Sequence, residues 1–174
     1  ASPNTTVLTA VFDASFRDFR PNNTAQWFYY LKSLKSIEGL EHLNTSQVTS
    51  LGSMFRGCSS LTTLDLSSFD TSQVTYMGDM FYGCSSLTSL DLSSFNTSKV
   101  ISMGRMFSCC SSLSSLDLTS FNTLEVANMR SMFSSCSSLS SLDLSGFDTS
   151  EVTDMSWMFS CCSSLSTLDL TSFN

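Results

Sequence analysis

A unit of 26 residues recurs along most of this 174-residue chain and constrains its fold more than any other feature. One copy begins at Leu61, and the following copies begin at Leu87, Leu113, Leu139 and Leu165. Such repeats form solenoids, because a single unit cannot bury its own apolar face and must stack on its neighbours. We therefore expect a stack of similar coils, in which each repeat position forms a column along the surface or through the core.

Each unit predicts a short strand followed by a short helical segment. Around Asp65, apolar and polar residues alternate from Leu64 to Ser67, a pattern typical of a half-buried strand. Apolar side chains then recur at spacings of three and four, which indicates one buried face of a helix. These residues are Val74, Met77, Met80, Phe81 and Cys84. The sequence thus predicts an α/β solenoid, a right-handed stack of coils with one parallel β-sheet and short helical turns on the opposite face.

The two ends of the chain differ from the repeat. Residues 1–43 are rich in aromatic side chains and lack the regular period, as expected for a unit that covers the first coil. We predict that residues 1–43 form an N-terminal cap and that residues 44–174 form a solenoid of about five coils. The C-terminal end has no polar cap after Phe173. We therefore expect either that the native polypeptide continues or that another molecule covers this end.

Composition and charge argue against several classes of function. Apolar residues make up 41% of the chain and occur at fixed positions, which a disordered tract would not need. The net charge is −7 with eight Lys and Arg, so we expect no binding to nucleic acid. No apolar run is long enough to cross a bilayer, which predicts no membrane insertion. The sequence also lacks a recognisable catalytic triad or phosphate loop, so we expect neither enzymatic activity nor a cofactor.

A long motif runs through the repeats and can be compared with known repeat families. It reads Met-Phe-x-x-Cys-Ser-Ser-Leu-x-x-Leu-Asp-Leu-Ser-x-Phe-Asp/Asn-Thr-Ser-x-Val-Thr, is carried by residues 54–75 and recurs up to Asn174. In this motif the chain resembles the BspA-type leucine-rich-repeat surface proteins of bacteria. The resemblance implies a secreted or surface-attached protein that binds proteins of a host or of neighbouring cells. It does not identify the ligand, because a shared fold does not carry a shared site.

A column of carboxylates on the predicted strands is the first candidate binding site. Its members are Asp65, Asp91, Asp117, Asp143 and Asp169. Neighbouring carboxylates repel one another, so a cation or a basic partner surface could neutralise them. The alternative is structural: the aspartates keep the face soluble and accept hydrogen bonds from adjacent Ser and Thr. The sequence leaves both interpretations open.

The second candidate site lies on the predicted outer face, where three columns vary between copies. The variable positions carry Tyr76, Tyr82, Arg105 and Trp157, together with smaller residues such as Ser108. Aromatic and arginine side chains are enriched among residues that dominate binding energy. Ordinary tolerance of substitutions at surface positions would produce the same variation.

The cysteines and the Asn-x-Ser/Thr sequences are weaker signals. Five cysteines occupy an inward repeat position, so we predict reduced, buried thiols at Cys58, Cys84, Cys110, Cys136 and Cys162. A metal site is not expected, because no Cys-x-x-Cys pair exists and the chain has one histidine. Acceptor sequences make N-glycosylation possible at Asn4, Asn22, Asn44 and Asn96.

Two functional hypotheses follow from these patterns. The first is a non-catalytic extracellular or cell-surface repeat protein that mediates adhesion, with a protein or glycan of a host or neighbouring cell as its partner. The alternative is a structural protein that self-associates through its solenoid ends into an extracellular fibre or surface layer. The chain begins Ala1-Ser2-Pro3 without Met, which is compatible with removal of a signal peptide or with an arbitrary boundary.

Overall fold

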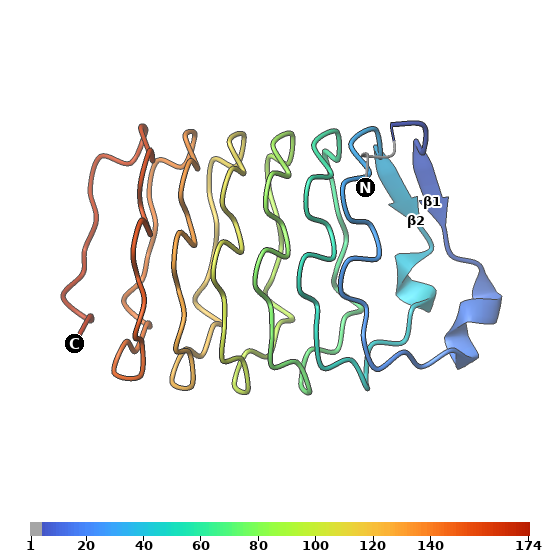
Figure 1. Cartoon of the computed structure of the whole chain (residues 1–174), viewed down its shortest axis with the longest axis horizontal. Coiled ribbons are helices and arrows are strands. Elements are labelled where there is room, and N and C mark those ends of the chain that lie inside the picture. Colours follow the sequence, from blue (N-terminus) through green and yellow to red (C-terminus); the bar gives the residue numbers. More distant parts are fainter. Residues whose placement is uncertain (1–4) are drawn as a thin grey trace.

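The 26-residue period appears in the structure as coils that lie side by side along one axis (Figure 1). The computed structural model describes residues 5–174. Successive repeats follow one another from the N-terminal end at the right of Figure 1 to the C-terminal end at the left, and the coils of the repeat region differ little in shape. The repeat therefore forms a solenoid, as the sequence predicts.

The regular elements assigned in residues 5–174 all lie before the first complete repeat. Strand β1 (Thr9–Val11) pairs in parallel with strand β2 (Ser36–Glu38), and Ala10 lies opposite Ile37. Each strand is followed by a short 3-10 helix, η1 (Ala14–Asp18) after β1 and η2 (Leu40–His42) after β2. This strand–helix alternation begins the stack, and the coils that follow continue it without regular strands or helices.

The segments predicted to be helical are instead runs of overlapping β-turns. Within residues 51–58, alternate N–H groups donate to the carbonyl three residues earlier, as from Met54 to Leu51. Ser53 and Gly57 have φ values of 57° and 75°, which turns accommodate and an α-helix does not. The prediction of short helices is therefore wrong, because half of the N–H groups in these segments bond outside their own coil.

Those other N–H groups form a hydrogen-bonded ladder between coils. Leu51 N–H donates to the Tyr76 carbonyl at 3.0 Å, and Ser53 N–H donates to the Gly78 carbonyl at 2.9 Å. The same pattern recurs at every junction, and parallel bridges join Ser50, Tyr76, Ser102, Asn128 and Asp154. We call the surface formed by the turn segments 24–31, 51–58, 77–84, 103–110, 129–136 and 155–162, with these bridge residues, the turn face.

The aspartate-bearing segments are extended but are not assigned as strands in the described part of the chain. We call this surface the aspartate face; it is centred on Asp65, Asp91, Asp117, Asp143 and Asp169. Asp65 Oδ1 accepts the N–H of Ser67 at 2.9 Å, and the equivalent bond recurs in the following coils. Such local side-chain bonds compete with inter-strand pairing. The predicted parallel sheet through these aspartates is therefore wrong, and the main hydrogen-bonded ladder lies on the turn face.

A column of stacked phenylalanine rings runs through the core. Its members are Phe28, Phe55, Phe81, Phe107, Phe133 and Phe159. Neighbouring ring centroids lie 5.4–5.8 Å apart, and the ring planes are tilted by only 5–9°. Leucine, methionine and valine columns surround these rings and are fully or almost fully buried in the central coils. The inward positions predicted from the repeat pattern are thus confirmed.

The inward cysteines are free thiols that contact the backbone of the phenylalanine column. Cys84 Sγ donates to the backbone carbonyl of Phe55 at 3.1 Å, and the same contact recurs in the other coils. Burial raises the pKa of the Cys58 and Cys136 thiols to about 12. Four of the five thiols are fully buried and Cys162 is half-buried, so the predicted reduced column is confirmed.

A buried threonine joins each coil to the next through its hydroxyl. Thr97 Oγ1 donates to the Asn122 carbonyl at 2.8 Å and accepts the Asn122 N–H at 2.8 Å. Equivalent bonds are made by Thr45, Thr71, Thr123 and Thr149. The backbone groups that these hydroxyls serve belong to the following coil.

The turn geometry predicts a stabilising substitution. Ser135 has a φ of 63°, whereas the equivalent positions of two earlier coils carry Gly57 and Gly83. Ser135→Gly is expected to raise the free energy of unfolding by about 0.5–1 kcal/mol, because glycine adopts this left-handed conformation without the Cβ penalty. The neighbouring change Ser134→Gly, outside the positive-φ region, is expected to lower it by a similar amount. Urea denaturation of both variants checks this, and equal effects would contradict the turn assignment.

The first coil lies inside the segment predicted to be a cap. The N–H of Thr24 donates to the Ser50 carbonyl at 3.3 Å, so the ladder already includes residues 24–31. The ring of Phe12, which follows β1, packs edge-on against Phe28 at a centroid distance of 6.2 Å and covers the N-terminal end of the ring column. The division at residue 43 stays a prediction.

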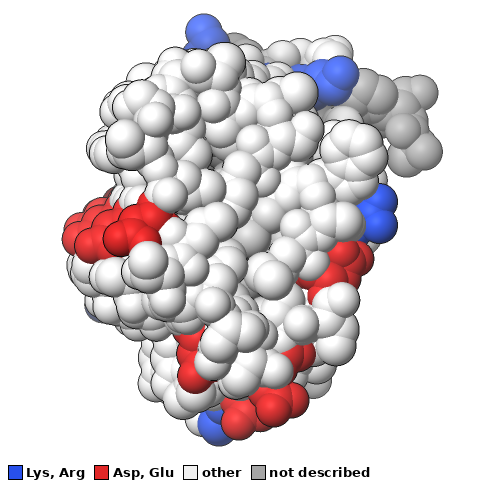
Figure 2. Space-filling view, turned by 90° about the vertical axis from the view of Figure 1, so that its left-hand side faces the viewer, with Lys and Arg blue, Asp and Glu red and all other residues white. Residues whose placement is uncertain are grey.

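The opposite end of the stack exposes apolar side chains. Met155, Trp157 and Leu170 are 36%, 67% and 39% exposed, and Phe159 and Leu165 are only half-buried. Figure 2 looks onto this end and shows a centre without charged residues, with acidic groups at its edge. The last coil of the given sequence therefore presents side chains of the kind that the preceding coils bury between them.

Candidate functional site

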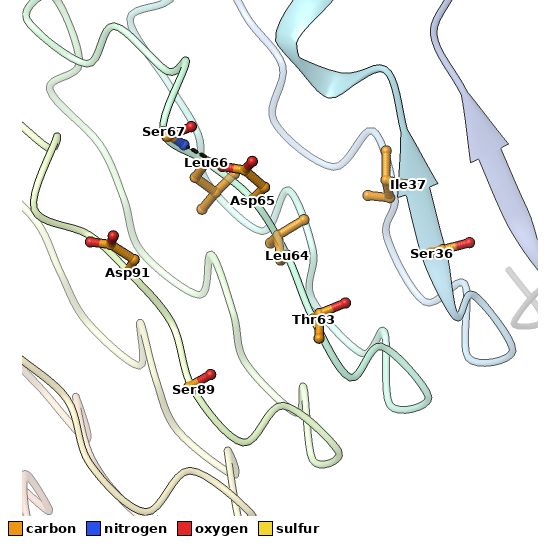
Figure 3. Close-up of a pocket in the computed structure, with 9 residues that line it drawn as sticks. All are labelled: Ser36, Ile37, Thr63, Leu64, Asp65, Leu66, Ser67, Ser89 and Asp91. Carbon is orange, nitrogen blue, oxygen red and sulfur yellow. Dashed lines mark hydrogen bonds between the residues drawn. The ribbon is translucent and has the colours of Figure 1, made fainter.

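The aspartate face contains shallow grooves between successive extended segments. The first has a volume of about 390 Å³ and lies between β2 and the two segments that carry Asp65 and Asp91. Figure 3 shows Asp65 and Thr63 on one segment, with Ile37 on β2 to one side and Asp91 on the other. A second groove of about 320 Å³ repeats this arrangement one coil further along. The face therefore offers two similar grooves, each lined by Asp, Ser, Thr and Leu side chains.

The carboxylates of this face are held by local hydrogen bonds. The backbone N–H and the hydroxyl of Ser67 lower the pKa of Asp65, whereas the neighbouring charge of Asp91 raises it by a smaller amount. The pKa of Asp117 is lowered in the same way by Thr119, against the repulsion of the carboxylates on both sides. Local capping therefore outweighs repulsion along the column. This geometry fits the structural interpretation of the aspartates, and a binding role for them stays a prediction.

The capped aspartates predict how stability depends on pH. Their pKa values lie below the unfolded value of about 3.9, so the stability from their hydrogen bonds is present above about pH 4. It is lost as the pH falls through the folded pKa values. Urea midpoints are expected to be similar at pH 7 and pH 5 and to fall below about pH 4. A higher midpoint at pH 3 than at pH 5 would mean that repulsion dominates the column.

The predicted outer-face residues have different environments. Tyr76 and Trp157 are 42% and 67% exposed, and the Arg105 side chain is 50% exposed. Tyr82 is half-buried because the Arg56 guanidinium lies 4.1 Å from its ring centroid. The prediction that position 108 is an open surface position is wrong, because Ser108 is only 4% exposed.

A buried ion-pair network underlies part of the turn face. The Asp79 side chain is only 7% exposed and pairs with two arginines from neighbouring coils. Arg56 bonds to Asp79 Oδ1, and Arg105 Nη2 lies 3.0 Å from Asp79 Oδ2. A buried carboxylate needs such partners to remain charged. Asp79 thereby fixes the position of Arg105, whose remaining N–H groups face the surface.

Tyr76 and Arg105 line the same groove of about 300 Å³, which crosses three coils of the turn face. Two other residues of this groove, Asn128 and Arg130, were not predicted as site residues from the sequence. Arg130 occupies a repeat position where three earlier copies have glycine, and that departure from the repeat was the available signal. Tyr82 and Trp157 are not among the residues that line the groove. We call it the Tyr76 groove.

The possible glycosylation sites differ in accessibility. Asn22 and Asn96 are exposed, and Asn44 is partly buried. The Asn96 side-chain oxygen accepts the N–H of Ser98 at 3.1 Å, and Asn44 makes the equivalent bond to Ser46. Asn4 lies outside the described residues. Modification of any of the four stays a prediction.

Residues 5–174 contain neither a cluster of metal-binding side chains nor a membrane-spanning helix. No group of three or more His, Cys, Asp or Glu side chains there is arranged to hold a metal ion. None of the helices in this part of the chain has the length and apolar character needed to span a bilayer.

The stacked 26-residue coils with apolar columns define the chain as a leucine-rich-repeat type solenoid. Residues 22–116 and 113–174 match the family described as "Mycoplasma protein of unknown function, DUF285". The chain belongs to this family. The resemblance of its motif to the BspA-type leucine-rich-repeat proteins is thereby confirmed. No curated protein matches the sequence.

Several solved bacterial structures are similar to this chain at low sequence identity. A leucine-rich repeat protein from Eubacterium ventriosum is 20% identical with a TM-score of 0.51, over 95% of this chain and 45% of its own. The leucine-rich repeat protein TpLRR of T. pallidum is 21% identical with a TM-score of 0.48, over 76% and 67%. A leucine rich cell surface protein from Faecalibacterium prausnitzii is 22% identical with a TM-score of 0.34, over 63% and 31%. This chain therefore spans less than half of the Eubacterium protein.

Proposed function

We propose that this chain is a non-catalytic binding module, secreted or displayed on a bacterial surface, that mediates adhesion to a protein or glycan of a host or neighbouring cell. The proposal rests on one observation: residues that depart from the repeat gather in one groove. Tyr76, Arg105, Asn128 and Arg130 all differ from the residues at the same position in most other copies, and they line one groove. Repeat solenoids use extended surfaces of this kind for binding.

The scaffold under this groove is suited to presenting a binding surface. The turn face is cross-linked by backbone hydrogen bonds at every coil junction, so its side chains project from a rigid support. The reactive side-chain types have structural roles instead. The inward thiols donate to backbone carbonyls, and the aspartates of the aspartate face cap local turns. These roles support binding over catalysis.

A cell-binding experiment with two matched variants tests this proposal. Fluorescently labelled chain is added to cultured epithelial cells and to neighbouring bacteria, and bound fluorescence is measured against concentration. The turn-face variant carries Tyr76→Ser and Arg105→Ser, residues that other coils have at these positions. The control carries Asp91→Asn and Asp117→Asn on the aspartate face.

We expect saturable binding that the turn-face variant weakens at least about tenfold and the control variant leaves unchanged. Absence of saturable binding to either kind of cell would overturn the binding role. Loss of binding in the aspartate-face variant alone would keep the role and overturn its assignment to the turn face.

The alternative role, end-to-end assembly into a fibre or surface layer, is favoured by the polarity of the ladder. Every junction joins N–H donors of one coil to carbonyls of the next, and the corresponding donors in residues 155–161 have no backbone acceptor among residues 5–174. Trp157 is also exposed beside them. Light scattering distinguishes the roles: a mass that rises with concentration favours assembly, and a constant monomer mass contradicts it.

A further inference from the structure

The Tyr76 groove combines an aromatic surface with several hydrogen-bond donors. Its volume is about 300 Å³, which lies at the lower end of the range for small-molecule sites. Its main lining residues come from three successive coils; they are Tyr76, Asp79, Ser102, Arg105, Asn128 and Arg130. Because these coils are joined by backbone bonds, the spacing of the side chains across the groove is fixed.

The side chain of Tyr76 lies close against the backbone at Gly52 and Gly78. A Cβ added to Gly52 or to Gly78 would come within 2.6 Å of atoms of this ring. The two glycines therefore allow the ring to rest on the coil, while 42% of the residue remains exposed. An exposed aromatic face held in this way is a platform on which the C–H face of a ring-shaped ligand can pack.

The arginines beside the ring have unused donors. Arg105 gives one N–H to Asp79 at 3.0 Å, and its side chain is still 50% exposed. Arg130 Nη1 lies 3.8 Å from Asp154 Oδ2, beyond hydrogen-bond reach, and its side chain is 56% exposed. Guanidinium groups of this kind can each give two parallel hydrogen bonds to one carboxylate.

Asn128 adds a neutral donor to the groove lining. Its side-chain oxygen accepts the backbone N–H of Arg130 at 2.9 Å, which fixes the amide and leaves its NH₂ group for a ligand. Ser102 lies between Tyr76 and Asn128 in the same column and also lines the groove. Such groups match the hydroxyls of a sugar.

The groove is also locally positive in an acidic chain. The guanidinium groups of Arg56 and Arg105 both pair with Asp79. The guanidinium group of Arg130 lies 3.8 Å from Asp154. The local balance is one positive charge, whereas the whole chain carries −7. A ligand with a negative charge is therefore attracted here rather than to the aspartate face.

We propose that the Tyr76 groove binds a carboxylate-bearing saccharide, such as a uronic acid unit. The sugar ring packs on Tyr76, its carboxylate bonds to Arg105 and Arg130, and its hydroxyls bond to Asn128 and Ser102. A peptide fits less well, because the lining offers one exposed aromatic surface and no apolar hole for a side-chain anchor. The inference deepens the proposed binding function and rests on it.

NMR titration with matched small probes tests the chemistry. The probes are methyl β-glucuronide, its neutral counterpart methyl β-glucoside, and acetate. We expect the glucuronide to shift signals of the groove with a dissociation constant of about 1 mM or tighter, and both other probes to bind at least about fivefold more weakly. Glucoside binding as tight as glucuronide, or acetate binding as tight as glucuronide, would overturn the assignment.

Variants taken from the repeat itself locate the site. Arg130→Gly and Tyr76→Ser introduce residues that other coils carry at the same positions, so both chains are expected to fold. Each should weaken glucuronide binding about tenfold, and Tyr76→Ser should leave acetate binding unchanged. Lys99→Ser removes a charge outside the groove lining and should change nothing. Equal loss in the Lys99 variant would mean general charge attraction and overturn the site.

The outcome separates this inference from the function on which it rests. Failure of the glucuronide to bind, together with cell binding that the turn-face variant weakens, would overturn the saccharide and keep the binding module. Displacement of the glucuronide by a tri-glutamate peptide at lower concentration would identify a protein ligand instead, and would likewise overturn the saccharide. Absence of both glucuronide binding and cell binding would overturn both proposals.

Discussion

Replacing Phe81 by alanine is expected to lower the free energy of unfolding by about 3–5 kcal/mol. The residue is 0% exposed, and its ring stacks on Phe55 and Phe107, both at a centroid distance of 5.8 Å. Its removal deletes buried apolar area and leaves a cavity between two flat rings that cannot move together without breaking the ladder of backbone bonds. Urea denaturation followed by circular dichroism measures the loss.

The matched control for this substitution is the last ring of the same column. Phe159 is half-buried and stacks on one ring, that of Phe133, again at 5.8 Å. Phe159→Ala is therefore expected to cost about 1–2 kcal/mol. Similar losses at both positions would show that stacking on two sides adds little and that the ring column is not a main source of stability.

Replacing Thr97 by valine is expected to cost about 2 kcal/mol, although the shape of the side chain hardly changes. The residue is 1% exposed, and its hydroxyl both donates to and accepts from the backbone of Asn122. Valine leaves that N–H and that carbonyl of the next coil without their partner, and an unpaired group shielded from water costs about 1–3 kcal/mol. Denaturant midpoints of the variant give the difference.

An exposed threonine provides the comparison. Thr75 lies on the surface, and its hydroxyl donates to the Thr49 carbonyl at a longer distance of 3.3 Å. Water can replace this bond, so Thr75→Val is expected to change stability by less than about 0.5 kcal/mol. If Thr75→Val cost as much as Thr97→Val, the effect would belong to threonine propensity and not to the buried bridge.

The repeat pattern predicted the core well, because a column is defined by spacing alone. Met80, Phe81 and Cys84 were placed inside from their recurrence, and all three are 0% exposed. The backbone that carries them could not be predicted in the same way. Spacings of three and four are produced by a helix and equally by overlapping turns, and nothing marks Ser53 or Asp79 as positive-φ residues.

The alternation around Asp65 was misleading for a related reason. It indicates an extended chain with one face inside, which is correct, but extended backbone pairs only where its N–H and carbonyl groups are available. The capping bond from Ser67 uses one of those groups in each coil. Of the candidate site, Tyr76 and Arg105 could be selected from their columns. That these two residues line one groove with Arg130 depends on the turn geometry, which could not be predicted from the sequence.

The threonine bridge and the turn ladder have a consequence for how such a gene can change. Both connect a coil only to the coil beside it. An in-frame duplication or deletion of one 26-residue unit therefore recreates the same junction where the sequence is rejoined. Insertions of other lengths break the register at once. Recombination between the repeats can therefore lengthen or shorten the array while the fold is kept. It can also bring variable residues such as Tyr76 and Arg130 into new neighbourhoods, which generates new surfaces on an unchanged scaffold.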